Sequence, residues 1–382
     1  MFLLGGYLTL MIGPAIPIPA PEFLTKTIES VSVQESDSGR TGFSVTFAVG
    51  RDTFTGAVDF LPLLSQVVKV GHRVVIMVVI NAMPHVISDG IVTKLDLSPG
   101  LEPGQSKLSI TGTDISALMD LFEYKLPAPG TTDAAAAGLA MGKYSAFLIP
   151  SPPIPPIPDV PFSPTERTRT LSGTDYEVLT SLANRNGYVF YVTPGKVPGM
   201  NIGYWGPLIP IPPIPQPALT VRMGNATNVN SISFSINGDE PVIIAGNALQ
   251  EKTSGAPVPV VGVPMPPLLS LVKASIASAP YIKVRHHEDP QGGDALRAIA
   301  VASAKMARAE AQAVTASGEV DVARYGSILR ARKLVGVRGA GLTFDGNWYC
   351  SSVSHSIARG KYTQSFSLMR DGVMSNTPMV RP

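Results

Sequence analysis

Hydrophobic and polar residues alternate with a period of two along much of the chain, which is typical of half-buried β-strands. In the segment 43–49, Phe, Val, Phe and Val occupy every second position, with Ser, Thr and Ala between them. The segment 74–80 is apolar throughout, as expected for a strand covered on both faces. Asp89-Gly90 is a dipeptide typical of tight hairpin turns, so a return strand is predicted from Ile91. These elements predict a first β-barrel.

The same alternation returns in the second half of the chain. The segment 232–236 alternates Ile and Phe with Ser and ends at Asn237-Gly238. Asp345-Gly346 separates two further predicted strands. In 362–368, Tyr, Gln, Phe and Leu face one way, and Thr and Ser face the other. A second β-rich region is therefore predicted.

Three segments have helical periodicity instead. Thr113 or Asp114 can cap a helix whose apolar positions 115, 118, 119 and 122 follow i, i+3, i+4, i+7 spacing. Thr174 and Glu177 have the spacing of a capping box at the start of a second helix. An Ala-rich third helix is predicted for 294–314.

The first two predicted helices begin with the same tripeptide. Gly-Thr-Asp occupies 112–114 and again 173–175, and Leu118 and Leu179 each follow four residues after the Asp. A cap followed by an apolar stripe also arises independently, so internal duplication and coincidence both stay open.

Proline is abundant, with 36 residues, and gathers in apolar tracts at 14–21, 152–164, 207–217 and 257–267. Ile and Val alternate with Pro in these tracts, whereas flexible linkers are rich in Ser, Gly and charged residues. We expect extended polyproline II segments that pack on the protein surface. Ligands for a proline-recognising domain are the alternative, but the flanking basic residues of such ligands are missing.

Charged residues make up only 15% of the chain, against about 25% in an average soluble protein. Because few charges are available to coat the surface, we expect other subunits to cover much of it. The net charge is +2 without blocks of either sign, which argues against a nucleic-acid-binding module.

The first 21 residues carry no charge, a feature shared with signal peptides and membrane anchors. No basic residue precedes this apolar stretch, four prolines interrupt it, and no clear cleavage site follows. Neither an export signal nor a transmembrane segment is therefore predicted.

Cys350 is the single cysteine, which excludes an intramolecular disulfide and a cysteine-based metal cluster. With His355 it forms the sharpest catalytic hypothesis, a thiol nucleophile and its base. Residues five apart on a strand point to opposite faces, so the two could meet only across a bulge. A core or interface cysteine is the plainer interpretation, and no catalytic, cofactor-binding or metal-binding residue is predicted.

Two other polar groups were considered. His286, His287 and Asp289 could ligate a metal, but Pro and Gly nearby favour a solvated surface loop. A mildly basic stretch could meet an acidic subunit or a phosphate, although outward positions on strands explain it more simply. This stretch consists of Arg324, Arg330, Arg332, Lys333 and Arg338.

Several segments carry a resemblance to a known family. They are the Ala-rich helix 296–311, Ala-Ser-Gly-Glu-Val-Asp at 316–321, Leu-Arg-Ala-Arg at 329–332, Phe-Asp-Gly-Asn-Trp-Tyr-Cys-Ser-Ser-Val-Ser-His at 344–355, and the strand 362–368, together with 112–120 and 182–192 upstream. In this order they resemble the phage late control D family of tail hub proteins, whose relatives include the hub portions of VgrG proteins and of extracellular contractile injection systems. The resemblance covers roughly half of the chain.

The resemblance implies an α+β, β-dominated fold with two tail-tube-like β-barrels and inserted helices. It also implies a structural, non-enzymatic baseplate hub whose homotrimer forms a pseudo-sixfold ring between a hexameric tube and a trimeric spike. The implied partners are its own copies, a tail tube or tube-initiator protein, a spike protein and other baseplate proteins, without specific nucleic-acid binding. Its place would be the virion tail baseplate or an injection particle, after synthesis in the bacterial cytoplasm without a signal peptide. Because 14 residues follow Leu368, we expect the spike to be a separate polypeptide.

The expected domain organisation combines the pattern with the resemblance. It comprises a first tube-like barrel ending in a helix (1–125), a Pro-rich insertion (126–165), a helix-strand region contributing to the second barrel (166–250), a Pro-rich connection (251–280), and a helix with the last strands of the second barrel (281–382). Two other functions stay open. A secreted or surface β-domain binding protein would be a stable monomer with exposed aromatic clusters, which the 7% aromatic content disfavours. A cysteine peptidase would depend on Cys350.

Overall fold

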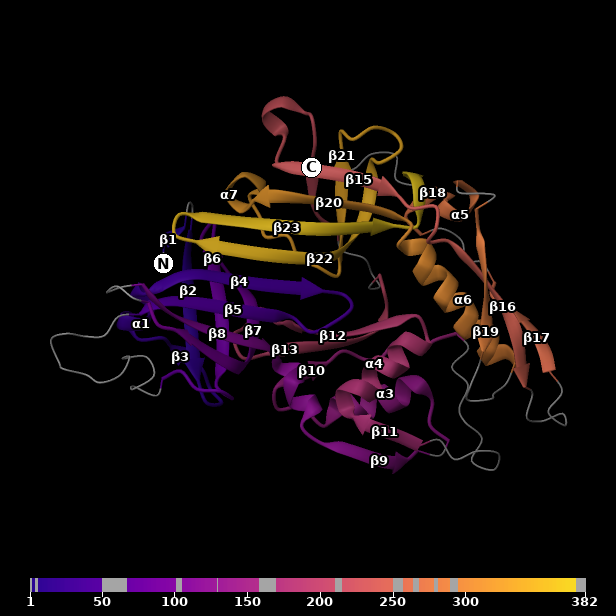
Figure 1. Cartoon of the computed structure of the whole chain (residues 1–382), viewed down its shortest axis with the longest axis horizontal. Coiled ribbons are helices and arrows are strands. Elements are labelled where there is room, and N and C mark those ends of the chain that lie inside the picture. Colours follow the sequence, from indigo (N-terminus) through magenta and orange to yellow (C-terminus); the bar gives the residue numbers. More distant parts are fainter. Residues whose placement is uncertain are drawn as a thin grey trace.

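Strands dominate the structure, a computed structural model, which confirms the α+β, β-dominated fold class. The structure describes residues 2–3, 6–49, 67–100, 105–128, 130–157, 170–209, 215–249, 257–263, 268–277, 281–288 and 295–375. Its largest sheet contains 14 strands and runs through most of the molecule (Figure 1). Two groups of strands in this sheet have separate hydrophobic cores, and smaller modules pack beside them.

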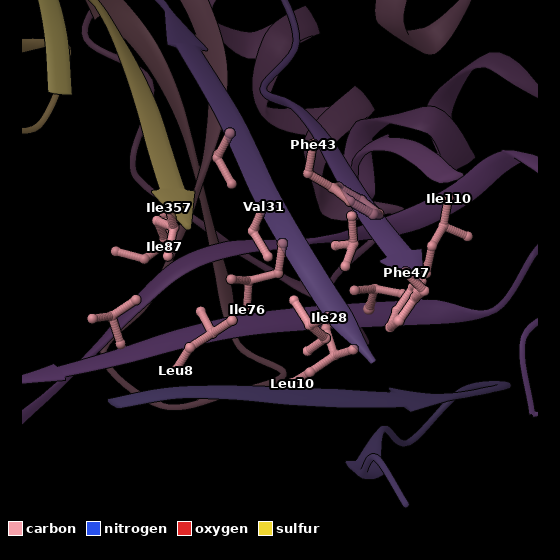
Figure 2. Close-up of a cluster of buried hydrophobic side chains, with 14 of the residues drawn as sticks. Leu8, Leu10, Ile28, Val31, Phe43, Phe47, Ile76, Ile87, Ile110 and Ile357 are labelled. Carbon is pink, nitrogen blue, oxygen red and sulfur yellow. The ribbon is translucent and has the colours of Figure 1, made fainter. Parts of the chain in front are cut away.

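The first group, here called the first β-unit, pairs antiparallel in the order β2-β6-β7-β8-β5-β4. Its strands are β2 (Gly6–Gly13), β4 (Ile28–Ser36), β5 (Gly42–Val49), β6 (Arg73–Ile80), β7 (Met83–Ser98) and β8 (Ser106–Asp114). The predicted alternation is confirmed in β5, where every second residue from Phe43 is buried. Figure 2 shows Leu8, Val31, Phe43, Ile76 and Ile110 converging from five of these strands.

The predicted turn at Asp89-Gly90 is wrong, because both residues lie inside β7. The chain reverses instead at Asn81 and Ala82, whose φ angles of 50° and 62° suit a tight hairpin turn. Gly90 is needed where two strands approach closely, since a Cβ there would lie 2.1 Å from the carbonyl oxygen of Thr113. The Asp-Gly pair therefore does not form a turn: Gly90 lies where two strands are crowded together, and Asp89 is a buried carboxylate.

The second group, here called the second β-unit, pairs in the order β15-β20-β23-β22, with β21 and then β14 beside the first part of β22. Its strands are β14 (Pro215–Thr220), β15 (Ser231–Ile236), β20 (Val314–Asp321), β21 (Lys333–Arg338), β22 (Gly346–Ala358) and β23 (Lys361–Arg370). Trp348, Cys350 and Phe366 belong to its buried core. The strands predicted on either side of Asp345-Gly346 are confirmed as the antiparallel pair β21 and β22.

One edge of β22 joins the two units. Residues 346–350 of β22 pair with β21, and residues 352–358 pair with β4 of the first unit. A bulge between Cys350 and Ser352 lies where the partner changes. We call the β4–β22 junction the seam. In the described ranges no strand pair closes either unit into a ring, so the two complete barrels stay a prediction.

A helical module packs below the seam in Figure 1 around its own core, which includes Trp205 and Leu179. Its elements are η1 (Ile115–Asp120), β9 (Glu123–Pro127), α3 (Asp133–Gly142), β10 (Leu148–Pro150), β11 (Thr170–Thr174), α4 (Asp175–Arg185), β12 (Tyr188–Pro194) and β13 (Asn201–Pro207). The capping box of Thr174 and Glu177 is confirmed at the start of α4. The Ala-rich helix α3 was not predicted.

The first predicted helix is wrong in length and type. It is a six-residue 3-10 helix, η1, capped by Asp114, and Phe122 beyond it is 78% exposed. In the second copy of Gly-Thr-Asp the cap is Thr174, one position earlier in the tripeptide. The two copies therefore start their helices at different positions of the tripeptide, and duplication and coincidence both stay open.

A smaller module consists of helix α6 (Ala295–Ala311) on a three-stranded sheet. The sheet contains β16 (Val242–Leu249), β17 (Pro257–Val261) and β19 (Lys283–Glu288). Ala298 and Ala302 allow close contact with Ile244 and Val260, which confirms the third predicted helix. The remaining elements are β1 (Phe2–Leu3), β3 (Ile18–Pro19), α1 (Glu22–Lys26), η2 (Gly224–Ala226), β18 (Ser270–Lys273), α5 (Ala274–Ala277), α7 (Val322–Tyr325) and β24 (Gly372–Ser375).

The described parts of the Pro-rich tracts pack on the protein only in part, since Ile157, Ile16 and Ile18 are 95%, 82% and 64% exposed. The Ile154 amide donates to the Trp205 carbonyl oxygen at 3.4 Å, and the Pro155 carbonyl oxygen accepts from the Tyr188 hydroxyl at 3.3 Å. Pro215 and Pro257 each begin a paired strand. Residues 158–164, 210–214 and 264–267 of these tracts lie outside the described residues. Among the described helices, none combines the length and apolar character needed to span a membrane.

Candidate functional site

A cluster of buried charged and polar side chains lies at the seam. Glu35 comes from β4, His355 from β22, Gln364 from β23, and Arg330 and Arg332 from the loop before β21. We call these five residues the seam cluster. Glu35, Arg332, His355 and Gln364 are at most 5% exposed. Because a buried charge is costly without partners, the contacts of these groups decide what the cluster does.

Arg330 ties the second unit to the first through its guanidinium group. Its Nη1 lies 2.7 Å from Glu35 Oε1 and donates to the Ile87 carbonyl oxygen at 3.3 Å, and its Nη2 donates to the Val86 carbonyl oxygen. The other Glu35 oxygen accepts from the Ala331 amide at 3.0 Å. Both carboxylate oxygens of Glu35 thus bind the loop before β21, and Arg330 of that loop also contacts β7.

Arg332 connects three parts of the molecule. Its Nε and Nη2 donate to the Ser36 carbonyl oxygen at 2.8 and 2.6 Å, and its Nη1 donates to the Val192 carbonyl oxygen of β12 at 3.0 Å. The guanidinium also lies over the Tyr191 ring, 4.3 Å from its centroid. Its φ of 67° is unusual for a side chain with a Cβ, so these contacts hold a strained backbone in place.

His355 is held in one tautomer. Gln364 is oriented by the Leu329 backbone, whose amide donates to Gln364 Oε1 at 3.0 Å and whose carbonyl oxygen accepts from Nε2 at 2.8 Å. His355 Nδ1 lies 3.2 Å from Gln364 Nε2 and 2.7 Å from the Tyr362 hydroxyl, and an Nδ1 that accepts from both leaves the ring proton on Nε2. His355 Nε2 then faces Glu35 Oε1 at 3.6 Å.

Burial and charge fix the ionisation of the cluster. Burial alone would raise the pKa of Glu35, but Arg330 and His355 overcome this and hold it well below its usual range. Burial lowers the pKa of His355, although Glu35 opposes that effect. At neutral pH an anionic Glu35 therefore faces a cationic arginine and a neutral imidazole.

Cys350 and His355 do lie on the same side of the sheet, because β22 contains the bulge that this arrangement requires. Both side chains are completely buried. Burial, followed by the nearby Glu35 and Asp37, raises the pKa of the Cys350 thiol well above its ordinary value. A thiol with a raised pKa is a poor nucleophile, and its Sγ contacts the Ser352 carbonyl oxygen at 3.7 Å. The geometry therefore favours the core cysteine over the catalytic one.

The other sequence candidates are placed differently from the predictions. The loop predicted for His286 and His287 is wrong, because both lie on strand β19, and Asp289 lies outside the described residues. Within the described ranges, no group of three or more His, Cys, Asp or Glu side chains could hold a metal. The outward positions predicted for Arg330 and Arg332 are also wrong, since the pairing with Glu35 and the Ser36 carbonyl oxygen draws them inward.

Glu35 was not among the predicted residues, although the sequence contains a signal for its burial. Residues 31, 33 and 35 occupy the same face of β4, and Val31 and Val33 are buried there. A carboxylate in register with two buried valines requires a buried cation. The Leu-Arg-Ala-Arg segment at 329–332 supplies it.

The comparisons with known proteins agree with this architecture. A tail protein from Neisseria meningitidis MC58 is similar over 97% of this chain and 98% of its own, with a TM-score of 0.63 and 13% identity. The 43 kDa tail protein of prophage MuSo2 from Shewanella oneidensis is similar over 96% and 99%, with a TM-score of 0.63 and 13% identity.

A third solved structure is the E. coli c3393 protein, a component of the type VI secretion system. It is similar over 93% of this chain and 78% of its own, with a TM-score of 0.54 and 10% identity. No protein-family model and no curated protein sequence matches the chain. The chain therefore has the fold of phage tail proteins and of a type VI secretion component, and the predicted resemblance is confirmed at the level of the fold.

Proposed function

We propose that this chain is the structural baseplate hub of a contractile phage tail or of a phage-like injection system, where it adapts a hexameric tube to a trimeric spike. The observation that carries the proposal is the near-complete coverage of a tail protein, 98% of its length, by the fold of this chain. Such coverage includes both β-units, the helical module and the seam, so the likeness is not limited to one common module.

The two β-units support the step from threefold to sixfold symmetry. Each chain supplies two units that are joined edge to edge through β4 and β22. Three copies would then present six β-units in a ring, which suits a hexameric tube on one side and a trimeric spike on the other. The partners are its own copies, the tube or tube-initiator protein, a separate spike protein and other baseplate proteins.

The seam cluster fits a protein that works by holding its shape. Arg330 and Arg332 anchor one loop of the second unit to β4, β7 and β12. These contacts fix the angle between the two units, as a ring of constant dimensions requires. In this proposal the chain acts through its interfaces and catalyses no reaction, and the assembled tail or injection particle is its place of action.

The test is the mass of the intact chain alone and together with purified spike and tube proteins of a contractile tail. Native mass spectrometry should find a complex of three chains, each of 40.2 kDa, and electron microscopy should show a threefold ring with the spike attached. A strict monomer that binds neither protein at any concentration would overturn the proposal. That outcome would favour a monomeric β-domain binding protein instead.

A further inference from the structure

One face of the main sheet is covered with hydroxyl groups across both β-units. In register, Ser233, Ser317, Ser367, Ser352 and Ser36 follow one another across β15, β20, β23, β22 and β4. A second row contains Thr363, Ser356, Ser32, Ser44 and Thr111, from β23 to β8. A third row lies between these two and contains Ser231, Glu319, Ser365, Ser354 and Gln34. A fourth row lies beside the second and contains Ser30, Thr46 and Ser109. We call these four rows the hydroxyl face.

Most of the hydroxyl face is exposed or half-exposed, although Thr363 at one end of the second row is only 9% exposed, and the opposite side of the same strands is buried. Ser32, Ser233 and Ser365 are exposed, whereas the alternating neighbours Val33 and Phe366 are buried. Adjacent strands also exchange contacts within the face, since the Oγ atoms of Ser233 and Ser317 lie 3.1 Å apart. The rows run without a break across the paired strands β4 and β22, so the polar face crosses the seam.

Charge is scarce on this surface. Glu319 is the charged member of the four rows. Lys94 and Asp321 continue the second row at its two ends, and Asp96 and Lys361 continue the row of Ser30, the latter through Ala358. A nucleic-acid-binding face would need clustered Lys and Arg to contact phosphates. The four rows of the hydroxyl face contain no cluster of Lys and Arg, so they do not form an electrostatic binding site for a polyanion.

The hydroxyl face is also unlike a subunit interface. The buried centre of a protein interface is enriched in aromatic residues, Met and Arg, and depleted in Ser. Large exposed apolar side chains occur elsewhere, such as Ile16 at 82%, Phe122 at 78% and Tyr281 at 76% exposure. Contacts between copies are therefore expected on those other surfaces, while a serine-rich face keeps its bound water.

We infer that the hydroxyl face lines the central opening of the hub ring and stays hydrated there, as a passage surface without charge selection. This inference rests on the proposed function. The face is shared by both β-units, and β4 and β22 lie near its middle. If it faces the axis, three copies give a lining of one chemistry around the whole opening, with water rather than a bound subunit against it.

The single buried cysteine makes a direct test possible. Cys350 is 0% exposed, so an engineered cysteine is the reactive thiol of the folded chain. Ser32→Cys and Ser354→Cys place a thiol on the hydroxyl face, and Lys125→Cys on the exposed strand β9 is the matched control. The unchanged chain gives the background, and each urea-unfolded variant gives full reactivity.

Each variant is assembled with its spike partner and treated either with a small maleimide or with a maleimide coupled to a folded carrier protein. We expect the small reagent to label Ser32→Cys and Ser354→Cys in the ring, the carrier-coupled reagent to fail there, and both reagents to label Lys125→Cys. Labelling of the face by the carrier-coupled reagent would show that it lies on the outside of the ring. Loss of labelling by the small reagent would show that a partner covers it. Either result overturns the inference.

The mass of each labelled sample separates this inference from the proposed function. If no ring forms with the unchanged chain, the proposed function fails first and the face has no opening to line. If a threefold ring forms and the face reacts with the carrier-coupled reagent, the hub assignment stands and the passage surface alone is wrong.

Discussion

The two faces of the main sheet reverse the usual distribution of charge. The exposed hydroxyl face is almost uncharged, while the buried side of the same strands carries Glu35 with Arg330 and Arg332 close by. Proteins usually keep ions at the surface because desolvation is costly. Here the exposed face carries few charges, whereas Glu35, Arg330 and Arg332 make fixed contacts on the buried side. We infer from this comparison that the buried charges fix how the two β-units are joined, and that the exposed hydroxyl groups keep other molecules from binding to the face.

Breaking the inner side of this comparison should have the largest effect. Glu35→Ala removes the carboxylate that holds Arg330 and the Ala331 amide. Because it leaves a largely buried cation without its partner, we expect a loss of about 3–5 kcal/mol in the free energy of unfolding. Urea denaturation followed by fluorescence measures this loss.

The matched control lies on the same strand. Glu29 is half-exposed and contacts Lys107 at 2.7 Å, so Glu29→Ala should cost about 0–1 kcal/mol. Equal losses for the two variants would show that Arg330 does not depend on its buried partner.

Crowding between strands beside the hydroxyl face gives the next prediction. Gly90→Ala would place a Cβ 2.1 Å from the Thr113 carbonyl oxygen and 2.7 Å from its carbonyl carbon. Separating β7 from β8 should cost about 1–3 kcal/mol, measured as a lower thermal midpoint at constant buffer. Gly142→Ala, where nothing lies within 4 Å of the added Cβ, is the control and should be neutral or slightly stabilising. A neutral Gly90→Ala would show that β7 and β8 can separate at this point without loss of stability, against the close approach of the two strands.

The buried thiol should matter for packing and not for activity of any kind. Cys350→Ala removes one buried sulfur from the core of the second unit, so we expect a loss of about 1 kcal/mol and unchanged assembly with the spike. Iodoacetamide should modify native Cys350 far more slowly than the unfolded chain, because burial raises the pKa of the thiol. Rapid modification of the native protein would revive the nucleophile hypothesis.

The smallest effect concerns pH. His355 has a lowered pKa in the folded chain, so folding favours its neutral form, and stability is lost as the pH falls below the pKa of an unfolded histidine, about 6.5. His355→Gln should reduce the stability lost between neutral and mildly acidic pH in urea titrations. If the variant and the unchanged chain lose the same stability over this interval, His355 does not contribute to the pH dependence.

Local patterns predicted the elements that depend on local chemistry. The alternation in β5 and the capping box of α4 were correct because neighbouring residues decide strand amphipathicity and helix capping. The fold class followed from the many alternating segments. Asp89-Gly90 failed because the sequence of a turn and that of a crowded strand pair can be identical.

The seam could not be predicted in the same way. β4 and β22 meet through register between distant segments, and no pattern within either strand specifies that pairing. The inward positions of Arg330 and Arg332 depend on the same pairing, so a basic stretch was placed outside. Glu35 was the one local signal of the seam. It lies on the same face of β4 as Val31 and Val33, which places its carboxylate in the core.

The long separation between β4 and β22 has a consequence for biosynthesis. Residues 30–36 pair with residues 352–358, so more than 300 residues must leave the ribosome before the edge of β4 is covered. At about 5–20 residues per second, this edge waits on the order of tens of seconds. A nascent chain with a bare strand edge can pair with its neighbours on a polysome. Such pairing stays possible until residues 352–358 emerge and cover the edge of β4.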